Sequence, residues 1–223
     1  MGTKFSTRIW VSVVGIASIF FGSKGYADTV ISVADFGLKP DTRENAVAYV
    51  QKAIEACRGK EPVTLVFPEG RYDFWPQYAH EKNYYETNTY DVFPKRLAML
   101  FEGFHNITVD GNGSQFVMHD RIQPITVENC DGVTLKNFSI DWDIPLTAQA
   151  RVIKVGSDFF EIEINVLESP YIIEDGKLVF VGEGWKSALG SMIEFESDTH
   201  FVVPGTGDLV LGRNWRDYTA VSP

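Results

Sequence analysis

Two aspartates lie two residues apart in the middle of the chain, at Asp141 and Asp143. On an extended strand, residues i and i+2 point to one face, about 6.6 Å apart at roughly 3.3 Å per residue. Hydrolysis of a glycosidic bond with inversion needs a carboxylic acid and a carboxylate roughly 6.5–9.5 Å apart. The pair is therefore a candidate for catalysis. Contact with sugar hydroxyls, or a strand-end turn before Pro145 with the carboxylates bonded to backbone amides, are the alternatives.

Aromatic side chains form a second group of candidates, because a sugar ring presents C–H groups that pack on a π face. We select four of them as candidate substrate-binding residues: Trp75, Tyr84, Tyr85 and Trp142. For each one taken singly, packing in a hydrophobic core is the alternative interpretation.

The spacing of histidines and cysteines predicts neither a metal nor a cofactor. His105 and His119 are far apart in the sequence, and no His/Cys cluster has the spacing of metal ligands. Neither a Gly-x-Ser-x-Gly motif nor a glycine-rich phosphate loop is present. The two cysteines, Cys57 and Cys130, could pair in an oxidising compartment, but two small buried thiols are the preferred interpretation.

The charge balance excludes two classes of partner. The 223 residues include 20 basic and 30 acidic side chains, which gives a net charge of −10. Nucleic acids and anionic lipids recruit basic surfaces, so neither is expected as a partner. The chain is 44% hydrophobic and 13% aromatic, which predicts a folded protein of one domain, or of one domain and part of a second.

The N-terminus has the three-part pattern of a secretory signal. Lys4 and Arg8 precede an apolar run over residues 9–21, and small residues stand at positions −3 and −1 of a cleavage site after Ala27. The apolar run is shorter than the roughly 20 residues that a membrane-spanning helix needs. We therefore expect a signal peptide at 1–27, a secreted or periplasmic mature protein, and no membrane contact after cleavage.

The elements that must position the candidate residues begin with a strand at 30–33. A helix is predicted over residues 42–57, with Asp41 and Glu44 as a capping box and Gly59 after its C-terminus. A buried strand follows at 63–67. Residues 71–96 are dense in aromatics but have no clear period, which predicts a long excursion packed by its own side chains.

A weak repeat follows, in which the pattern at 101–109 recurs at 127–135. The strands expected here are 107–110, 115–118, 124–128 and 133–141. Short strands at a fixed repeat favour a solenoid, and the N-terminal helix would cap its open end. We therefore predict a mainly β protein with a right-handed parallel β-helix over 28–144; a β-sandwich with two similar hairpins is the alternative.

After Pro145 the pattern changes to longer alternating strands, expected at 148–155, 159–166, 177–181 and 192–196. Hairpin-like links at 156–158 and 174–176 indicate an antiparallel sheet. Residues 145–223 are therefore expected to form a second unit, a β-barrel or sandwich that is incomplete at its C-terminus.

Three segments carry a resemblance to a known family. Residues 33–37 (VADFG) and 66–72 (VFPEGRY) resemble the entry of pectin-lyase-like β-helix enzymes, and residues 127–143 (VENCDGVTLKNFSIDWD) resemble the N-terminal part of the α-1,3-galactosidases of glycoside hydrolase family 110. The resemblance implies a secreted exo-enzyme that removes terminal α-1,3-linked galactose from blood-group-B-type and linear glycans, with inversion and without a metal.

The same resemblance implies galactose-terminated glycans as partners and leaves homo-oligomerisation open. Family members are considerably longer, and no catalytic aspartate of the family matches a position in this chain, which predicts a truncated chain. Two alternatives to a galactosidase remain: a polysaccharide lyase on the same fold, and a non-catalytic carbohydrate-binding β-helix fragment. Fold alone does not choose among them.

Overall fold

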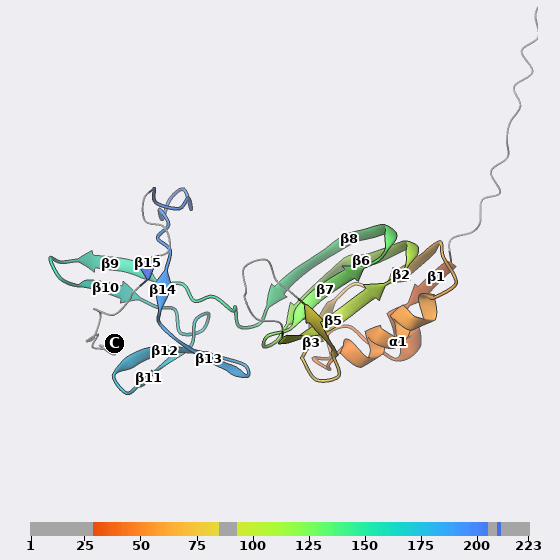
Figure 1. Ribbon diagram of the computed structural model, residues 1–223, viewed down its shortest axis with the longest axis horizontal. Helices are drawn as coiled ribbons and strands as arrows, with labels where there is room; N and C mark the ends of the chain where they lie inside the picture. Colours follow the sequence, from red (N-terminus) through yellow and green to blue (C-terminus); the bar gives the residue numbers. More distant parts are fainter. Residues whose placement is uncertain (1–28, 85–92, 205–208, 211–223) are drawn as a thin grey trace, which may run out of the picture.

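The computed structural model describes residues 29–84, 93–204 and 209–210. Figure 1 shows two lobes joined by an extended segment that follows β8; the first lobe holds the helix and strands β1 to β8, and the second holds β9 to β15. The expected signal peptide and Tyr85 lie outside the described residues. Within the described residues, no helix combines the length and apolarity needed to cross a membrane.

Parallel pairing dominates the first lobe. Its larger sheet has the order β1 (Thr29–Ser32), β2 (Val63–Val66), β6 (His105–Met118) and β8 (Asp131–Trp142), and β3 (Arg71–Phe74) pairs with the end of β6. A second sheet contains β4 (His80–Tyr84), β5 (Phe93–Glu102) and β7 (Gln123–Glu128). In that sheet β5 pairs in parallel with β7, and β4 is antiparallel to β5.

The strand register has the same offset as the weak repeat in the sequence. Met99 pairs with Ile125 and Ile107 pairs with Val133, which is the same offset in sequence as the repeated pattern. The turns repeat as well, because Asn106 (φ 56°) and Gly132 (φ 68°) both adopt the left-handed conformation. A side chain at Gly132 would come within 2.5 Å of the Asn106 amide oxygen, so only glycine fits this stacked turn.

The excursion expected at 71–96 contains strands that were not predicted, and its last residues, 93–96, belong to β5. Residues 71–74 form β3 and residues 80–84 form β4. The pattern is obscured because β3 is buried along three successive residues rather than alternating, since Asp73 is buried together with Tyr72 and Phe74.

The helix α1 (Val47–Cys57) begins five residues later than predicted. Asp41 (φ 60°) and Arg43 (φ 58°) adopt the left-handed conformation, which a helix excludes. The N-cap residue is Ala46, and the side-chain oxygen of the preceding Asn45 accepts a hydrogen bond from the Val47 N–H at 3.1 Å. Gly59 (φ 71°) follows the helix in the left-handed conformation, as predicted.

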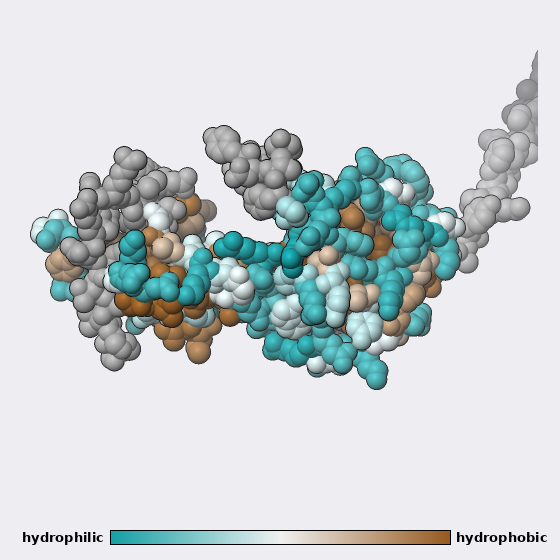
Figure 2. Space-filling model, turned by 60° about the horizontal axis from the view of Figure 1, so that its bottom comes forward, coloured by the Kyte–Doolittle hydropathy of each residue, from teal (hydrophilic) through white to brown (hydrophobic). Residues whose placement is uncertain are grey.

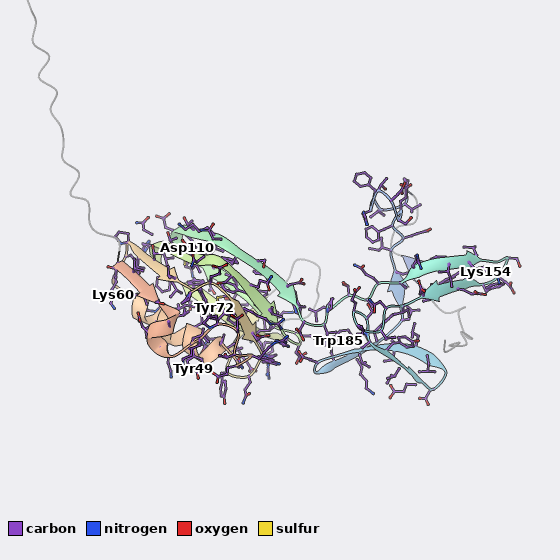
Figure 3. All side chains as sticks on the ribbon, turned by 180° about the vertical axis from the view of Figure 1, so that it is seen from behind. Tyr49, Lys60, Tyr72, Asp110, Lys154 and Trp185 are labelled. Carbon is purple, nitrogen blue, oxygen red and sulfur yellow. The ribbon has the colours of Figure 1, made fainter. Side chains whose placement is uncertain are left out.

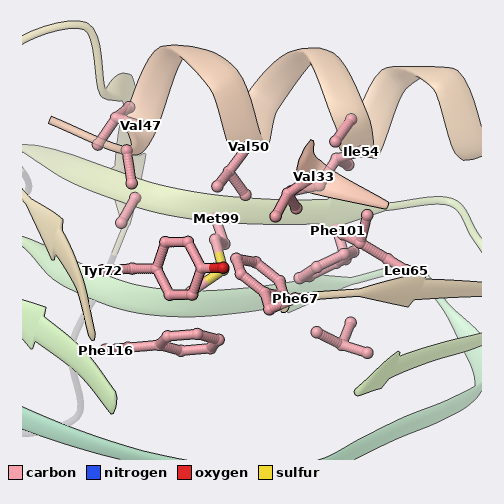
Figure 4. Packing of buried hydrophobic residues seen from close by; sticks show 14 of the residues in the cluster. Val33, Val47, Val50, Ile54, Leu65, Phe67, Tyr72, Met99, Phe101 and Phe116 are labelled. Atoms are coloured by element: carbon pink, nitrogen blue, oxygen red, sulfur yellow. The ribbon is translucent and has the colours of Figure 1, made fainter. Parts of the chain in front are cut away.

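The core of the first lobe lies between α1 and the sheets. Figure 4 shows Val47, Val50 and Ile54 of the helix facing aromatic rings from successive strands. Phe116 is fully buried, with its ring centroid 4.7 Å from those of Phe67 and Phe138. Cys57 and Cys130 are both free thiols; Cys57 is buried and Cys130 is partly buried. Burial raises the pKa of Cys57 to about 11.

The second lobe is antiparallel, as predicted. It contains β9 (Arg151–Val155) with β10 (Phe160–Glu163), the sheet β11 (Tyr171–Glu174), β12 (Lys177–Gly182) and β13 (Trp185–Ala188), and β14 (Ser191–Met192) with β15 (Leu209–Val210). The strands β11 and β13 were not predicted. Among the described residues this lobe buries few apolar side chains, and Figure 2 shows apolar surface over it; Leu167 is 85% exposed.

Candidate functional site

The candidate site is a cluster at the ends of three parallel strands, formed by Arg71 and Asp73 of β3, His119 after β6 and Asp143 after β8. The strand ladder extends one step beyond the strands: the His119 N–H donates to the Phe74 carbonyl and the Asp143 N–H donates to the Met118 carbonyl. Because the carboxyl ends of parallel strands meet at one edge, side chains from distant parts of the sequence come together there.

Arg71 bridges the two carboxylates of this strand-end cluster. Its Nη2 donates to one oxygen of Asp73 and one oxygen of Asp143, both at 2.6 Å. Burial raises the pKa of Asp73, but the hydrogen bonds from Arg71 and His119 outweigh it and hold the pKa below its usual value. The hydrogen bond from Arg71 likewise lowers the pKa of Asp143. Both groups are therefore ionised at neutral pH and accept hydrogen bonds.

His119 connects this cluster to the second lobe. Its side chain is 2% exposed, with Nε2 2.9 Å from Asp73 and Nδ1 2.6 Å from Glu183 in the turn between β12 and β13. The imidazole ring stacks on Trp75, with 3.7 Å between the ring centroids and 12° between the planes. The position of His119 is thus fixed on three sides, and one of its partners comes from the second lobe.

The cluster also has the composition of a metal site. Asp73, His119 and Asp143 each offer a ligand atom, and these atoms lie within 4.8 Å of one another. The guanidinium of Arg71, however, contacts both carboxylates and supplies the positive charge there. A metal ion would have to displace Arg71, so the residues fit an arginine-bridged carboxylate pair better than a metal centre.

The structure separates the two aspartates singled out from the sequence. Strand β8 ends at Trp142, so Asp143 lies beyond it and joins the cluster. The Asp141 carboxylate is exposed and accepts a hydrogen bond from the Trp142 N–H at 2.8 Å. The contacts of the cluster therefore include Asp143 and not Asp141.

The aromatic candidates also fall in different environments. Trp75 packs in the cluster against His119. Trp142 donates from Nε1 to the Asp120 carbonyl at 3.2 Å. Tyr84, on β4, donates a short hydrogen bond to the Glu128 carboxylate, away from the strand-end cluster. Of the three candidates that the structure describes, Trp75 is the one whose ring packs in the cluster.

Sequence reasoning missed Arg71, Asp73 and Glu183 as site residues and rejected His119. The one local signal was the alternation of Arg71 and Asp73, two charged residues on one face of a short strand flanked by aromatics. The contacts with His119 and Asp143 span 46 and 72 residues of sequence. Contacts between residues this far apart in the sequence leave no local pattern from which they could be predicted.

An open pocket of about 580 Å³ adjoins the cluster. It is lined by Arg43, Asn45, Trp75, Pro76, Gln77, Arg96 and Asp120. Arg43 links the pocket to the cluster, because its Nη1 lies 3.4 Å from Asp143. The pocket therefore combines an aromatic ring with side chains that both donate and accept hydrogen bonds.

Asp143 and Asp141 have different contacts, so replacing each with asparagine is expected to have a different effect on stability. Asp143→Asn weakens an ion pair with Arg71 and is expected to lower the free energy of unfolding by about 1 kcal/mol, because Asp143 is partly exposed. Asp141→Asn retains a hydrogen-bond acceptor for the Trp142 N–H and is expected to change it by less than about 0.5 kcal/mol. Urea unfolding of both variants checks the difference; equal losses would show that Asp143 is not held by Arg71 in solution.

Comparison with known proteins finds one family model and several named enzymes to which this chain is similar. Residues 148–222 match the family model described as GLAA-B beta-barrel domain I. The chain is 58% identical over 194 residues to alpha-1,3-galactosidase B of Bacteroides thetaiotaomicron, an alignment that covers 87% of this chain and 31% of that protein.

More distant relatives carry the same name. Alpha-1,3-galactosidase A of Shewanella woodyi is 36% identical over 75% of this chain and 28% of its own length. An alpha-1,3-galactosidase B of Phocaeicola vulgatus is 36% identical over 90% of this chain and 32% of its own length. The protein is thus a glycosidase homologue. More specifically, it is a homologue of the alpha-1,3-galactosidases and spans about a third of the length of these curated relatives.

Proposed function

We propose that this protein serves as an exported exo-α-1,3-galactosidase, which removes terminal α-1,3-linked galactose from glycans with inversion of the anomeric centre. The observation that carries the proposal is the 58% identity to an alpha-1,3-galactosidase over 87% of the chain. Export rests on the expected signal peptide at 1–27, and galactose-terminated glycans follow from the names of the relatives.

The architecture we propose for this function is a right-handed parallel β-helix over 28–144 that leads into a β-barrel over 145–223. The parallel pairings of β5 with β7 and of β6 with β8, at one shared offset in sequence, support the β-helix. The match of residues 148–222 to a β-barrel family supports the barrel. A β-helix stacks equivalent positions of successive coils, which would bring side chains together at the strand ends as in the cluster.

The charges of the cluster favour one chemical role. Inverting hydrolysis needs one carboxyl group that is protonated and donates to the leaving oxygen, and one carboxylate that activates water. Asp73 and Asp143 have lowered pKa values because Arg71 bonds to both. They are suited to accepting hydrogen bonds from hydroxyl groups or water, and the proton donor must be another carboxyl group of the protein.

The test is hydrolysis of galactosyl-α-1,3-galactose by the product of the native gene, followed by proton NMR. We expect β-galactose to appear first and to mutarotate afterwards, which is the signature of inversion. Disaccharides linked α-1,4 and α-1,6 serve as controls and should remain intact. Initial release of α-galactose would contradict inversion, and absence of galactose release would contradict the proposal. An unsaturated product that absorbs in the ultraviolet would indicate a lyase instead.

A further inference from the structure

The pocket beside the cluster has a geometry that points to one class of ligand. Its volume of about 580 Å³ lies within the range of about 300–1,000 Å³ typical of small-molecule sites. It lies where the end of β3 meets Arg96 of β5 and Asp120 after β6. We propose that this pocket is a non-hydrolytic subsite for a neutral saccharide unit, in which a sugar ring packs against Trp75 and its hydroxyl groups bond to Gln77, Arg96 and Asp120.

Trp75 is held rigidly enough to act as a platform. One face of its indole ring is covered by His119, and Trp75 remains partly exposed where it lines the pocket. Its backbone is fixed by the Asn45 amide, which accepts from the Trp75 N–H at 3.3 Å and donates to its carbonyl at 3.5 Å. A second bond from Asn45 to the Gln77 carbonyl, at 3.0 Å, fixes the next part of the wall. A preorganised aromatic surface loses little entropy on binding.

The polar groups of the pocket retain bonding capacity. A guanidinium has five N–H donors, and the Arg96 side chain uses Nη2 for Glu81 at 2.9 Å while remaining half exposed. Arg43 is 58% exposed and contacts Asp143 at 3.4 Å. The Asp120 carboxylate receives the Arg121 N–H on one oxygen, which leaves lone pairs for further donors.

The arrangement of charge favours an uncharged ligand. Each pocket arginine already faces a carboxylate, Asp143 for Arg43 and Glu81 for Arg96, and an anionic ligand would also meet Asp120. A cation would meet the two arginines. Sugar hydroxyls both donate and accept hydrogen bonds, so they can satisfy the arginines and Asp120 at the same time.

Among the described residues that line the pocket, there is no pair of carboxyl groups of the kind that hydrolysis requires. Asp120 is the one carboxylate among the residues that line it, and the adjacent Asp73 and Asp143 are kept ionised by Arg71. A glycan held here is therefore bound without cleavage. The inference rests on the proposed function for its choice of a galactose-containing glycan as the ligand.

The experiment is an NMR titration of the full chain with D-galactose, a probe that cannot be hydrolysed. We expect shifts at Trp75, Gln77 and Arg96, and a fivefold to tenfold weaker affinity in Gln77→Ala and Arg96→Ala. Arg151→Ala is the matched control, because Arg151 is also an exposed strand arginine paired to a glutamate, Glu163, across an antiparallel pair. Its affinity should equal that of the parent chain.

Galacturonate distinguishes a neutral subsite from an anion site, and we expect it to bind more weakly than galactose. Tighter binding of galacturonate, or equal affinities of the Arg96→Ala and Arg151→Ala variants, would overturn the inference. The outcome is separable from the proposed function. Hydrolysis without galactose shifts at the pocket would refute the subsite alone, and binding at the pocket by a protein that hydrolyses nothing would support the subsite while contradicting the function.

Discussion

Arg71→Met is expected to destabilise the first lobe by about 3 kcal/mol, because it removes the nearest cation of the fully buried Asp73 carboxylate and leaves only Arg43, at 3.8 Å, and the His119 ring beside it. Methionine retains the apolar stem of the side chain, so the decrease in the free energy of unfolding measures the removal of the charge rather than a loss of packing. Urea unfolding of the mature chain at pH 7 measures the effect. The matched control is Arg151→Met, whose exposed pair with Glu163 is expected to contribute less than about 1 kcal/mol.

The pH dependence gives this prediction a specific sign. In the parent chain the pKa values of Asp73 and Asp143 are lower in the folded state than the usual value of 3.8, so their contribution is complete above about pH 4 and is lost as the pH falls through the lowered values. In Arg71→Met the deficit should instead shrink as the pH approaches 4, because protonation of Asp73 removes the buried charge that has lost its nearest cation. Asp73→Asn in the Arg71→Met background should recover part of the loss at pH 7. A deficit that is independent of pH and is not recovered would show that Arg71 acts through packing.

The repeat of parallel strands could be predicted because its period depends on residues at fixed positions in short stretches of the sequence. Each turn needs a residue in the left-handed conformation, and Asn106 and Gly132 stand at equivalent turns of successive repeats. The antiparallel character of the second lobe was predictable for the same reason, since Asp175 and Gly176 both have positive φ and form a short hairpin turn.

The strand-end cluster could not be predicted from that period, because the offset in sequence between β6 and β8 changes along this one pair of strands. Ile107 pairs with Val133, but Ser114 pairs with Phe138, so the offset in sequence is shorter in the second half of the two strands. Residues 111–113 of β6 stand opposite the single residue Asn137 of β8. A constant offset would have aligned His119 with Pro145.

The shortened offset aligns His119 with Asp143 instead. The predicted start of the helix was wrong for a related reason. Asp41 does not cap the helix, because its carboxylate accepts a hydrogen bond from the Arg71 N–H, 30 residues away. Both errors come from contacts between distant residues, which override the local signals.

Gly184→Ala is expected to detach the second lobe from the first. Gly184 has φ 70°, and a Cβ atom there would lie 2.3 Å from an oxygen of the Asp120 carboxylate. The same turn holds Glu183 on His119 and Trp185 near the Arg121 guanidinium, 5.9 Å from the ring centroid, and Figure 3 shows Trp185 on the side of the second lobe that faces the first. Displacing the turn removes all of these contacts together, so the segment joining the lobes should be cleaved about tenfold faster in limited proteolysis.

Gly176→Ala is the control that separates backbone strain from collision. Gly176 has φ 75° in the turn between β11 and β12, and a Cβ atom there meets nothing within 4 Å. Both variants carry the left-handed penalty of about 1 kcal/mol. Gly184→Ala alone breaks the contact between lobes, so it alone should expand the radius of gyration in small-angle scattering and free the His119 ring from Glu183. Equal behaviour of the two variants would mean that the turn does not hold the lobes together, and that the strand-end cluster is complete without the second lobe.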